Sequence, residues 1–448
     1  MKKTKGYKLY KNSIFIQHNE PQSLASQKKK TGFLVLFCTL ISITNSFGQN
    51  DVKQSDQSSE KIYSLSGPNS VEHQLKEDSK SHSQATDIWY ALDSLDQRKK
   101  RFTDKTGFSI GVDYNSQIMG ATETMGDDYA ASGVFRVYGK WNLAGRGTAH
   151  EGGLVYKIEH RHKYTDLPLR EWGLAGVGYA GFLQSVYNDQ KFRVTNLYWR
   201  QTFGTDKVVV YAGFVDVTDW TDVYAMASPW SGFNNLAFAT SSGTMGGLYP
   251  DGSLGVMISA WLTKNIYVVA GMVDLHGDAT EFYKGFDTFF NDFETVKTFE
   301  VGYTPGLESV FFRNAHLTFW QSDETTTATS GWGAMGSVSW GIGNWFPFLR
   351  GGWSDGGGNS FYKASISTGI GYNIAGPNTL GVGLNWNKPN EAFFGGNLKD
   401  QYLSEIFYKW QVTHHTELTP SIQLLGNPAL NPDTDFSTVF ALRARVFL

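Results

Sequence analysis

The stretch Phe440-Ala-Leu-Arg-Ala-Arg-Val-Phe-Leu448 decides the fold class, because its side chains alternate strictly between two faces. Leu442 and Val446 lie on one face and Arg443 and Arg445 on the other, which is the period of a β-strand. If this strand crosses a membrane, an arginine on its lipid face costs about 2–4 kcal/mol near the midplane. We therefore expect both arginines to face a lumen.

The same alternation extends back along the chain to about residue 106. Phe108, Ile110 and Val112, for example, alternate with Ser109 and Gly111. We count sixteen or seventeen such segments of 8–14 residues, and the irregular Gly-rich residues 172–187 are not a strand, which leaves sixteen. Since a tilted strand of about 9–11 residues crosses the hydrocarbon, the pattern predicts an all-β fold, a transmembrane antiparallel β-barrel of sixteen strands.

Composition separates this barrel from the alternatives. The 448 residues are 41% hydrophobic, 15% aromatic and 18% charged, which argues against a disordered chain. No apolar run reaches the length of about 18 residues that a membrane-spanning helix requires. A soluble β-sandwich also alternates, but its strands are usually shorter. Aromatic residues recur near segment ends, at Trp340, Trp345, Trp386 and Tyr402, which is typical of interfacial girdles.

The N-terminal region divides into three parts before the barrel. Residues 1–48 combine a basic region with the short apolar run Phe33–Ile43 and predict a signal peptide; a short membrane anchor is the alternative. Residues 49–86 are rich in Ser, Gln, Lys and Asp and predict a polar disordered tail. Residues 87–105 predict a short helical periplasmic segment, and the barrel spans 106–448.

Cysteine content and charge exclude several functions. The single cysteine, Cys38, lies in the predicted signal, so the mature chain has no thiol for catalysis, disulfides or zinc. Removal of the signal leaves 31 Lys and Arg against 41 Asp and Glu, which disfavours nucleic-acid binding. No Gly-x-Ser-x-Gly or His-Glu-x-x-His motif is present, so we expect no enzyme, no cofactor and no metal site.

Several stretches resemble the carbohydrate-selective porin (OprB) family. They are residues 196–203, 210–216, 231–238, 248–256, 270–274, 404–413, 418–423, 427–429, 431–432 and 443–445. The resemblance covers about residues 106–448 and implies a sixteen-stranded outer-membrane porin of a Gram-negative bacterium that passes monosaccharides by facilitated diffusion. Within it, Asn235, Phe238, Tyr249 and Pro250 either shape an inward-folded constriction loop or only hold the conformation of that loop.

A sugar that crosses a narrow pore needs polar groups to replace its water and flat aromatic surfaces for its ring. Alternation places the following candidates in the lumen: Arg136, Lys140, Lys157, Glu159, Arg161, Glu300, Asn314, His316, Lys363, Glu405, Lys409, Gln423, Arg443 and Arg445, with Trp261 as the stacking ring. Any one of them is either in the substrate path or a wall charge with a partner across the barrel. A slip of one residue at a bulge reverses the predicted face.

The predicted function is passive diffusion of carbohydrates such as glucose through the bacterial outer membrane. Two alternatives stay open: a general diffusion porin without sugar selectivity, and a plugged barrel that acts as a structural or surface-binding protein. The expected partners are carbohydrate solutes, outer-membrane lipid and lipopolysaccharide, and the barrel-insertion machinery; the chain is a monomer or a homo-oligomer.

Overall fold

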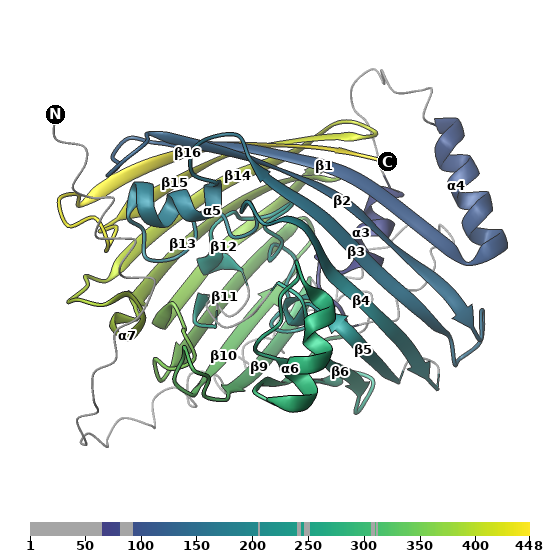
Figure 1. Ribbon diagram of the computed structural model, residues 1–448. Helices are drawn as coiled ribbons and strands as arrows, with labels where there is room; N and C mark the ends of the chain where they lie inside the picture. Colours follow the sequence, from purple (N-terminus) through teal and green to yellow (C-terminus); the bar gives the residue numbers. More distant parts are fainter. Residues whose placement is uncertain are drawn as a thin grey trace.

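The computed structural model describes residues 65–80, 93–204, 207–239, 243–245, 251–305, 310 and 312–448. Sixteen antiparallel strands, each paired with its neighbours in the chain, form a barrel that β1 and β16 close (Figure 1). The predicted sixteen-stranded barrel is therefore confirmed. The predicted signal peptide lies outside the described residues. No helix in the described part of the chain is both long enough and apolar enough to span a membrane.

The strands are β1 (Phe108–Ala121), β2 (Tyr129–Ala144), β3 (Gly152–Lys163), β4 (Lys191–Phe203), β5 (Val208–Val215), β6 (Ser253–Trp261), β7 (Ile266–Asp274), β8 (Thr295–Tyr303), β9 (Arg313–Ser322), β10 (Gly331–Trp340), β11 (Trp345–Ser354), β12 (Tyr362–Ala375), β13 (Asn378–Pro389), β14 (Gln401–Thr413), β15 (Thr416–Gly426) and β16 (Phe436–Phe447). Residues 172–187 contain no strand, as predicted.

The two faces of each strand carry different chemistry. On β16, Phe440, Leu442 and Val446 are exposed on the outside, whereas Arg443 and Arg445 are buried inside the barrel. Aromatic side chains lie exposed at strand ends, including Trp345 at the start of β11. An apolar exterior with aromatic rims matches the surface that a bilayer requires.

The two ends of the barrel differ in the length of their connections. At one end, here called the loop end, the long connections 164–190, 216–252 and 275–294 join the strands. At the other, the turn end, connections are short, such as residues 376–377. β1 starts and β16 finishes at the turn end.

Two of the long connections fold into the lumen. Residues 164–190 contain α5 (Leu169–Trp172) and the π-helical turn η2 (Gly173–Val177). Residues 216–252 contain the 3-10 turns η3 (Val217–Asp219) and η4 (Leu236–Phe238). Their apolar side chains form one buried cluster with inward-facing Phe348 of β11 and Phe407 of β14. The core of the protein therefore lies inside the barrel.

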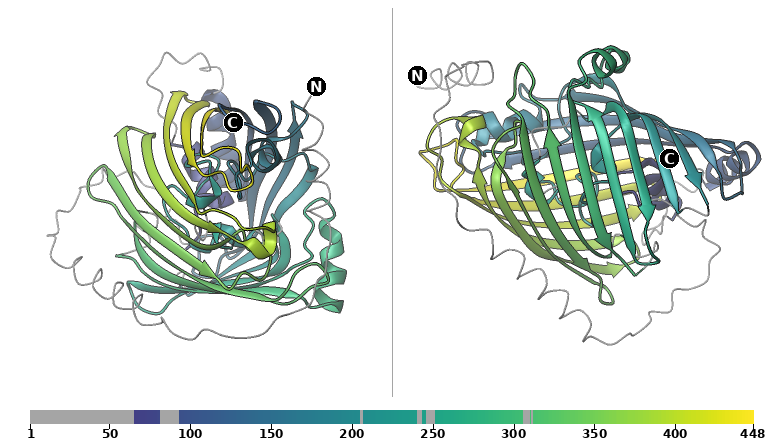
Figure 2. Two further views of the ribbon diagram at one scale, coloured as in Figure 1. Left: turned by 90° about the vertical axis from the view of Figure 1, so that its left-hand side faces the viewer. Right: turned by 90° about the horizontal axis from the view of Figure 1, so that it is seen from below.

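The third long connection stays outside the wall. η6 (Phe282–Lys284) and α6 (Gly285–Asn291) cover the outward-facing Phe214 and Leu254 of β5 and β6. Both views in Figure 2 show α6 outside the ring of strands. At the same end, α7 (Glu391–Phe394) follows β13.

In the described residues, two helices precede β1. α4 (Asp93–Thr106) lies within the predicted helical segment 87–105 except for its last residue, next to the start of β1, and residues 87–92 lie outside the described part. α3 (Val71–Asp78) contradicts the predicted lack of structure across 49–86, because it is a helix with Val71 buried. It packs against the inner face of β1, β2 and β3, inside the barrel (Figure 1). Its few apolar residues suit a polar lumen, which explains why composition alone suggested disorder.

Candidate functional site

The connection 216–252 is held in the lumen by charged residues of the wall. Glu405 of β14 accepts hydrogen bonds from the backbone N–H groups of Asn234 (2.7 Å) and Asn235 (3.1 Å). Arg443 of β16 donates to the carbonyl oxygens of Pro229 (2.8 Å) and Gly232 (3.1 Å). The wall charges thus satisfy backbone groups that the lumen removes from bulk water.

A second anchor of this connection is Asp222, which has a positive φ of 54°. Its carboxylate forms an ion pair with Arg350 of β11 and lies 2.7 Å from Nε2 of His316 on β9. Its backbone N–H donates to Glu300 of β8 over 2.7 Å. All four side chains are at most 2% exposed, so the connection is tied to three neighbouring regions of the wall by buried charges.

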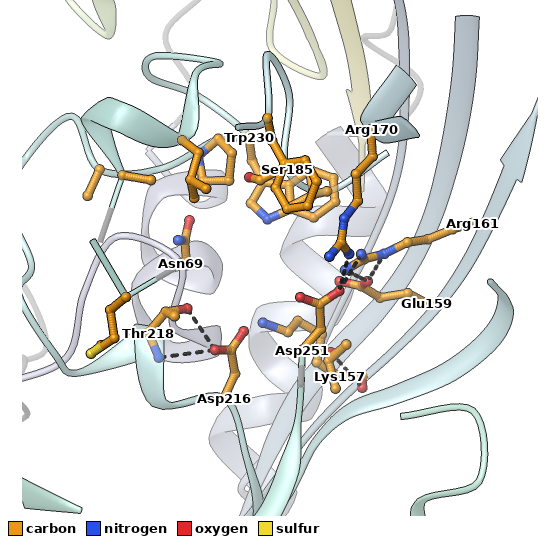
Figure 3. A pocket seen from close by; sticks show the side chains of 18 residues that line it. Asn69, Lys157, Glu159, Arg161, Arg170, Ser185, Asp216, Thr218, Trp230 and Asp251 are labelled. Atoms are coloured by element: carbon orange, nitrogen blue, oxygen red, sulfur yellow. Dashed lines mark hydrogen bonds and ion pairs between the residues drawn. The ribbon is translucent and has the colours of Figure 1, made fainter. Parts of the chain in front are cut away.

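Between this connection and β3 lies a cavity of about 100 Å³ (Figure 3). Lys157, Glu159 and Arg161 project into it from β3, and Asp216 and Asp251 come from the two ends of the connection 216–252. A single buried water needs roughly 10–15 Å³ of cavity volume, so this cavity has room for several waters. It is therefore a small cavity with polar walls inside the packed interior of the barrel.

Asp251 is the centre of the charged wall of the cavity. Its carboxylate lies 2.9 Å from Arg161, 3.0 Å from Arg193 and 3.6 Å from Arg170. Burial by itself raises the pKa of Asp251, but the guanidinium groups of Arg193, Arg161 and Arg170 outweigh it and hold that pKa well below its usual range. Glu159 also pairs with Arg161, at 2.6 Å. This wall presents fixed donors and acceptors side by side.

Aromatic rings line the cavity beside the charged wall. These are Trp230 and Phe182, and each has a guanidinium over its ring: Arg136 lies 4.1 Å from the Trp230 centroid and Arg170 lies 4.4 Å from the Phe182 centroid. These cation–π contacts fix the rings next to the charged wall. Apolar ring edges and paired polar groups in one cavity are suited to a solute that is itself polyhydroxylated with apolar faces.

A pair of carboxylates lies at one side of the cavity: Asp216 lines it, and Asp219 lies next to the cavity residue Lys157. Asp216 accepts hydrogen bonds from the backbone N–H (3.0 Å) and hydroxyl (2.7 Å) of Thr218, and Asp219 lies 3.8 Å from Lys157. Burial raises the pKa of Asp219 to about 7, with Lys157 opposing the shift and Asp216 adding to it. The charge of this region therefore changes near neutral pH.

The structure divides the predicted lumen residues into groups. Those that line the cavity are Lys157, Glu159 and Arg161. Those that hold the connection 216–252 are Glu300, Asn314, His316, Glu405, Gln423 and Arg443. Arg136 and Arg445 contact α3. Trp261 packs against the buried cluster to which Val71 of α3 belongs, and Lys409 is half-buried on β14. Lys140 is half-buried on β2.

Lys363 differs from its predicted position. A register shift between Tyr362 and Ala364 turns Tyr362 into the interior, where it is fully buried, and leaves Lys363 exposed beside Gly356 of a loop-end connection. The bulge breaks the alternation on which the prediction rested.

The predicted motif residues of the connection 216–252 have structural contacts. Asn235 accepts a hydrogen bond from the backbone of Ala237 (3.0 Å) and donates to Gln423 (3.0 Å). Phe238 packs on Phe233, with ring centroids 4.4 Å apart. Tyr249 and Pro250 lie outside the described residues.

The cavity residues that were missed from the sequence include Asn69, Arg170, Asp216, Trp230 and Asp251. They lie in segments without strand periodicity, so alternation assigns them no face. Asp216 and Asp251 do fall in stretches that resemble the porin family, which was the available signal.

Comparisons with known proteins bear on the family and the fold of the chain. The model of the carbohydrate-selective porin, OprB family, matches residues 100–342. The high-pH structure of Pseudomonas putida OprB has a TM-score of 0.65 at 15% identity, covering 82% of this chain and 99% of that chain. The low-pH structure of the same protein has a TM-score of 0.48 at 13% identity, with coverage of 82% and 99%. A triple mutant of the Rhodopseudomonas blastica porin has a TM-score of 0.46 at 11% identity, with coverage of 76% and 100%. Among curated proteins, a sequence search finds no match.

Proposed function

The chain belongs to the carbohydrate-selective porin (OprB) family, and from that premise we propose that it conducts carbohydrates, monosaccharides such as glucose, by passive diffusion across the bacterial outer membrane. The observation that supports this most directly is the cavity in the lumen, where Asp251 and Arg161 face the rings of Trp230 and Phe182. A sugar exchanges its water for these polar groups and leaves again because no single contact is strong. Family and fold are those of a channel.

The orientation and surroundings follow from the same proposal. Bacterial barrels place short turns in the periplasm and long loops outside, so the turn end faces the periplasm and the loop end faces the exterior. We propose removal of residues 1–48 as a signal peptide, insertion by the barrel-insertion machinery, contact with lipid and lipopolysaccharide, and association of copies as a homo-oligomer.

The test is single-channel conductance of the refolded protein in a planar bilayer, with glucose, maltose and a non-sugar solute of similar size added in turn. We expect saturable block of the ion current by sugar and none by the non-sugar solute. Open channels without sugar block would indicate a general diffusion porin without sugar selectivity. Folded, inserted protein without channels would favour the structural or surface-binding alternative.

Asp251→Asn tests the charged wall of the cavity. Because a hydrogen bond to a charged group contributes about 1.5–3 kcal/mol, we expect the half-blocking sugar concentration to rise about tenfold. The three guanidinium groups lose their shared counter-charge, so anion permeability should rise as well.

Asp433→Asn is the matched control, since Asp433 is an exposed loop-end carboxylate outside the cavity. It removes the same charge and should leave block and selectivity unchanged. Equal sugar block in wild type and Asp251→Asn would show that the solute does not use this wall.

A further inference from the structure

Residues 65–80, here called the N-terminal insert, lie inside the barrel but precede residues 100–342, the part that the family model matches. The insert contributes no strand to the sheet, so its position in the lumen needs its own explanation.

The apolar contacts of the insert are with inward-facing residues of the wall and of the connection 216–252. Leu65 (3% exposed) and Val71 (1% exposed) belong to a buried cluster with Tyr198 of β4, Tyr211 of β5 and Trp220. Leu75 packs against the same cluster. These contacts attach the insert to the interior of the barrel.

Its polar contacts reach three parts of the wall. Asp78 pairs with Arg445 of β16, at 2.8 and 3.0 Å, and accepts from the hydroxyl of Tyr138 on β2. Glu72 lies 3.6 Å from Arg200 of β4, and Gln74 accepts from Arg136 of β2 over 3.4 Å. Arg445 is three residues from the last residue of the chain, so Asp78 is close to the turn end.

The insert also touches the cavity. Asn69 lines it together with Lys157 of β3. The backbone N–H of Gly67 donates to the carbonyl of Asp219, and a Cβ on Gly67 would lie 2.6 Å from Cγ1 of Val223. The insert thus packs directly against the connection 216–252, on the side of the cavity that leads to the turn end.

We propose that the N-terminal insert is a tethered plug, which narrows the solute path between the cavity and the turn end and widens it by leaving the barrel. This inference rests on the proposed channel function. An isolated helix shorter than about 12–15 residues is marginal in water, so α3 depends on its contacts with the wall and connection. Those contacts come from one short segment that takes no part in the sheet, so its departure breaks no strand pairing.

The test compares the single-channel conductance of protein that starts at residue 49 with protein that starts at residue 93. We expect the shorter protein to conduct at least about twofold more, because the path to the turn end is cleared. Heat-modifiable migration on a denaturing gel reports that both barrels are folded. Glucose block, measured on both proteins, tests the channel function separately.

Three point variants locate the effect in the insert. Val71→Asp introduces a charge into the buried cluster and Asp78→Asn removes the pair with Arg445, so both should move the conductance toward that of the shortened protein. Lys80→Gln is the control, because the contact of Lys80 is with Glu77 of the same segment and its side chain is 50% exposed. It should leave conductance unchanged.

Each outcome decides the proposal. Higher conductance in the shortened protein and in the two disrupting variants supports the plug. Equal conductance with glucose block retained would overturn the plug and leave the porin function in place. Folded, inserted barrels that conduct neither with nor without the insert would overturn both.

Discussion

Leu442→Arg is expected to lower the free energy of unfolding in a lipid bilayer by about 2–4 kcal/mol, the cost of an arginine on the lipid face at the midplane. Leu442 lies in the middle of β16, is 46% exposed on the outside, and pairs with Ile118 on β1. The next residue, Arg443, is the same chemical group facing inwards, where it donates to backbone carbonyls. One step along the strand therefore reverses the environment.

Phe436→Arg provides the matched control on the same strand. Phe436 is exposed at the loop end of β16, where the cost of arginine falls to about 0–1 kcal/mol. Urea unfolding of the barrel in lipid vesicles, followed by tryptophan fluorescence, measures both variants. Equal costs at the two positions would mean that the outer surface of β16 is not immersed in lipid.

The second large effect is expected for Asp222→Asn, which should lower the free energy of unfolding by about 3–5 kcal/mol. The substitution leaves Arg350, 1% exposed, without its carboxylate partner, and weakens the contact with His316. Asn is chosen because it tolerates the positive φ of 54° at this position, so the change removes charge without adding backbone strain. Loosening of the connection 216–252 should also weaken sugar block.

A double variant tests whether the unpaired charge of Arg350 accounts for the loss of stability. Asp222→Asn with Arg350→Leu removes both charges, so it should be more stable than Asp222→Asn alone, because the main penalty is an unpaired buried charge. Unfolding measurements on the two singles and the double give the coupling between the residues. Strict additivity of the two single effects would show that the ion pair does not hold the connection.

The barrel was predictable from the sequence because lipid and lumen impose opposite chemistry on alternate residues. Leu442 and Arg443 display that rule, and strand number followed from counting such segments. Lys363 does not follow this rule because a bulge shifts the register of β12. The alternation of polar and apolar residues does not reveal where a bulge occurs.

The site was only partly predictable. Lys157, Glu159 and Arg161 lie on β3, so alternation placed them correctly in the interior. Asp251 and Trp230 lie in the connection 216–252, whose inward fold depends on contacts with distant strands such as β14 and β16. Contacts between residues so far apart in the chain leave no pattern in the local sequence from which they could be predicted. The N-terminal insert was missed for a related reason: α3 docks in the lumen through only two apolar residues, Val71 and Leu75, together with charges that pair with the wall.

The closure of the barrel by β1 and β16 sets an order for folding. The seam pairs Asp113 with Phe447, at opposite ends of the sheet-forming chain, so its formation carries the largest loop-closure entropy of any strand pair in the described barrel. Hydrogen bonds between Val112 and Leu448 in both directions complete it. The two inward connections fill the interior that this seam encloses, so a nascent barrel that closes around them acquires its core and its wall in one cooperative step.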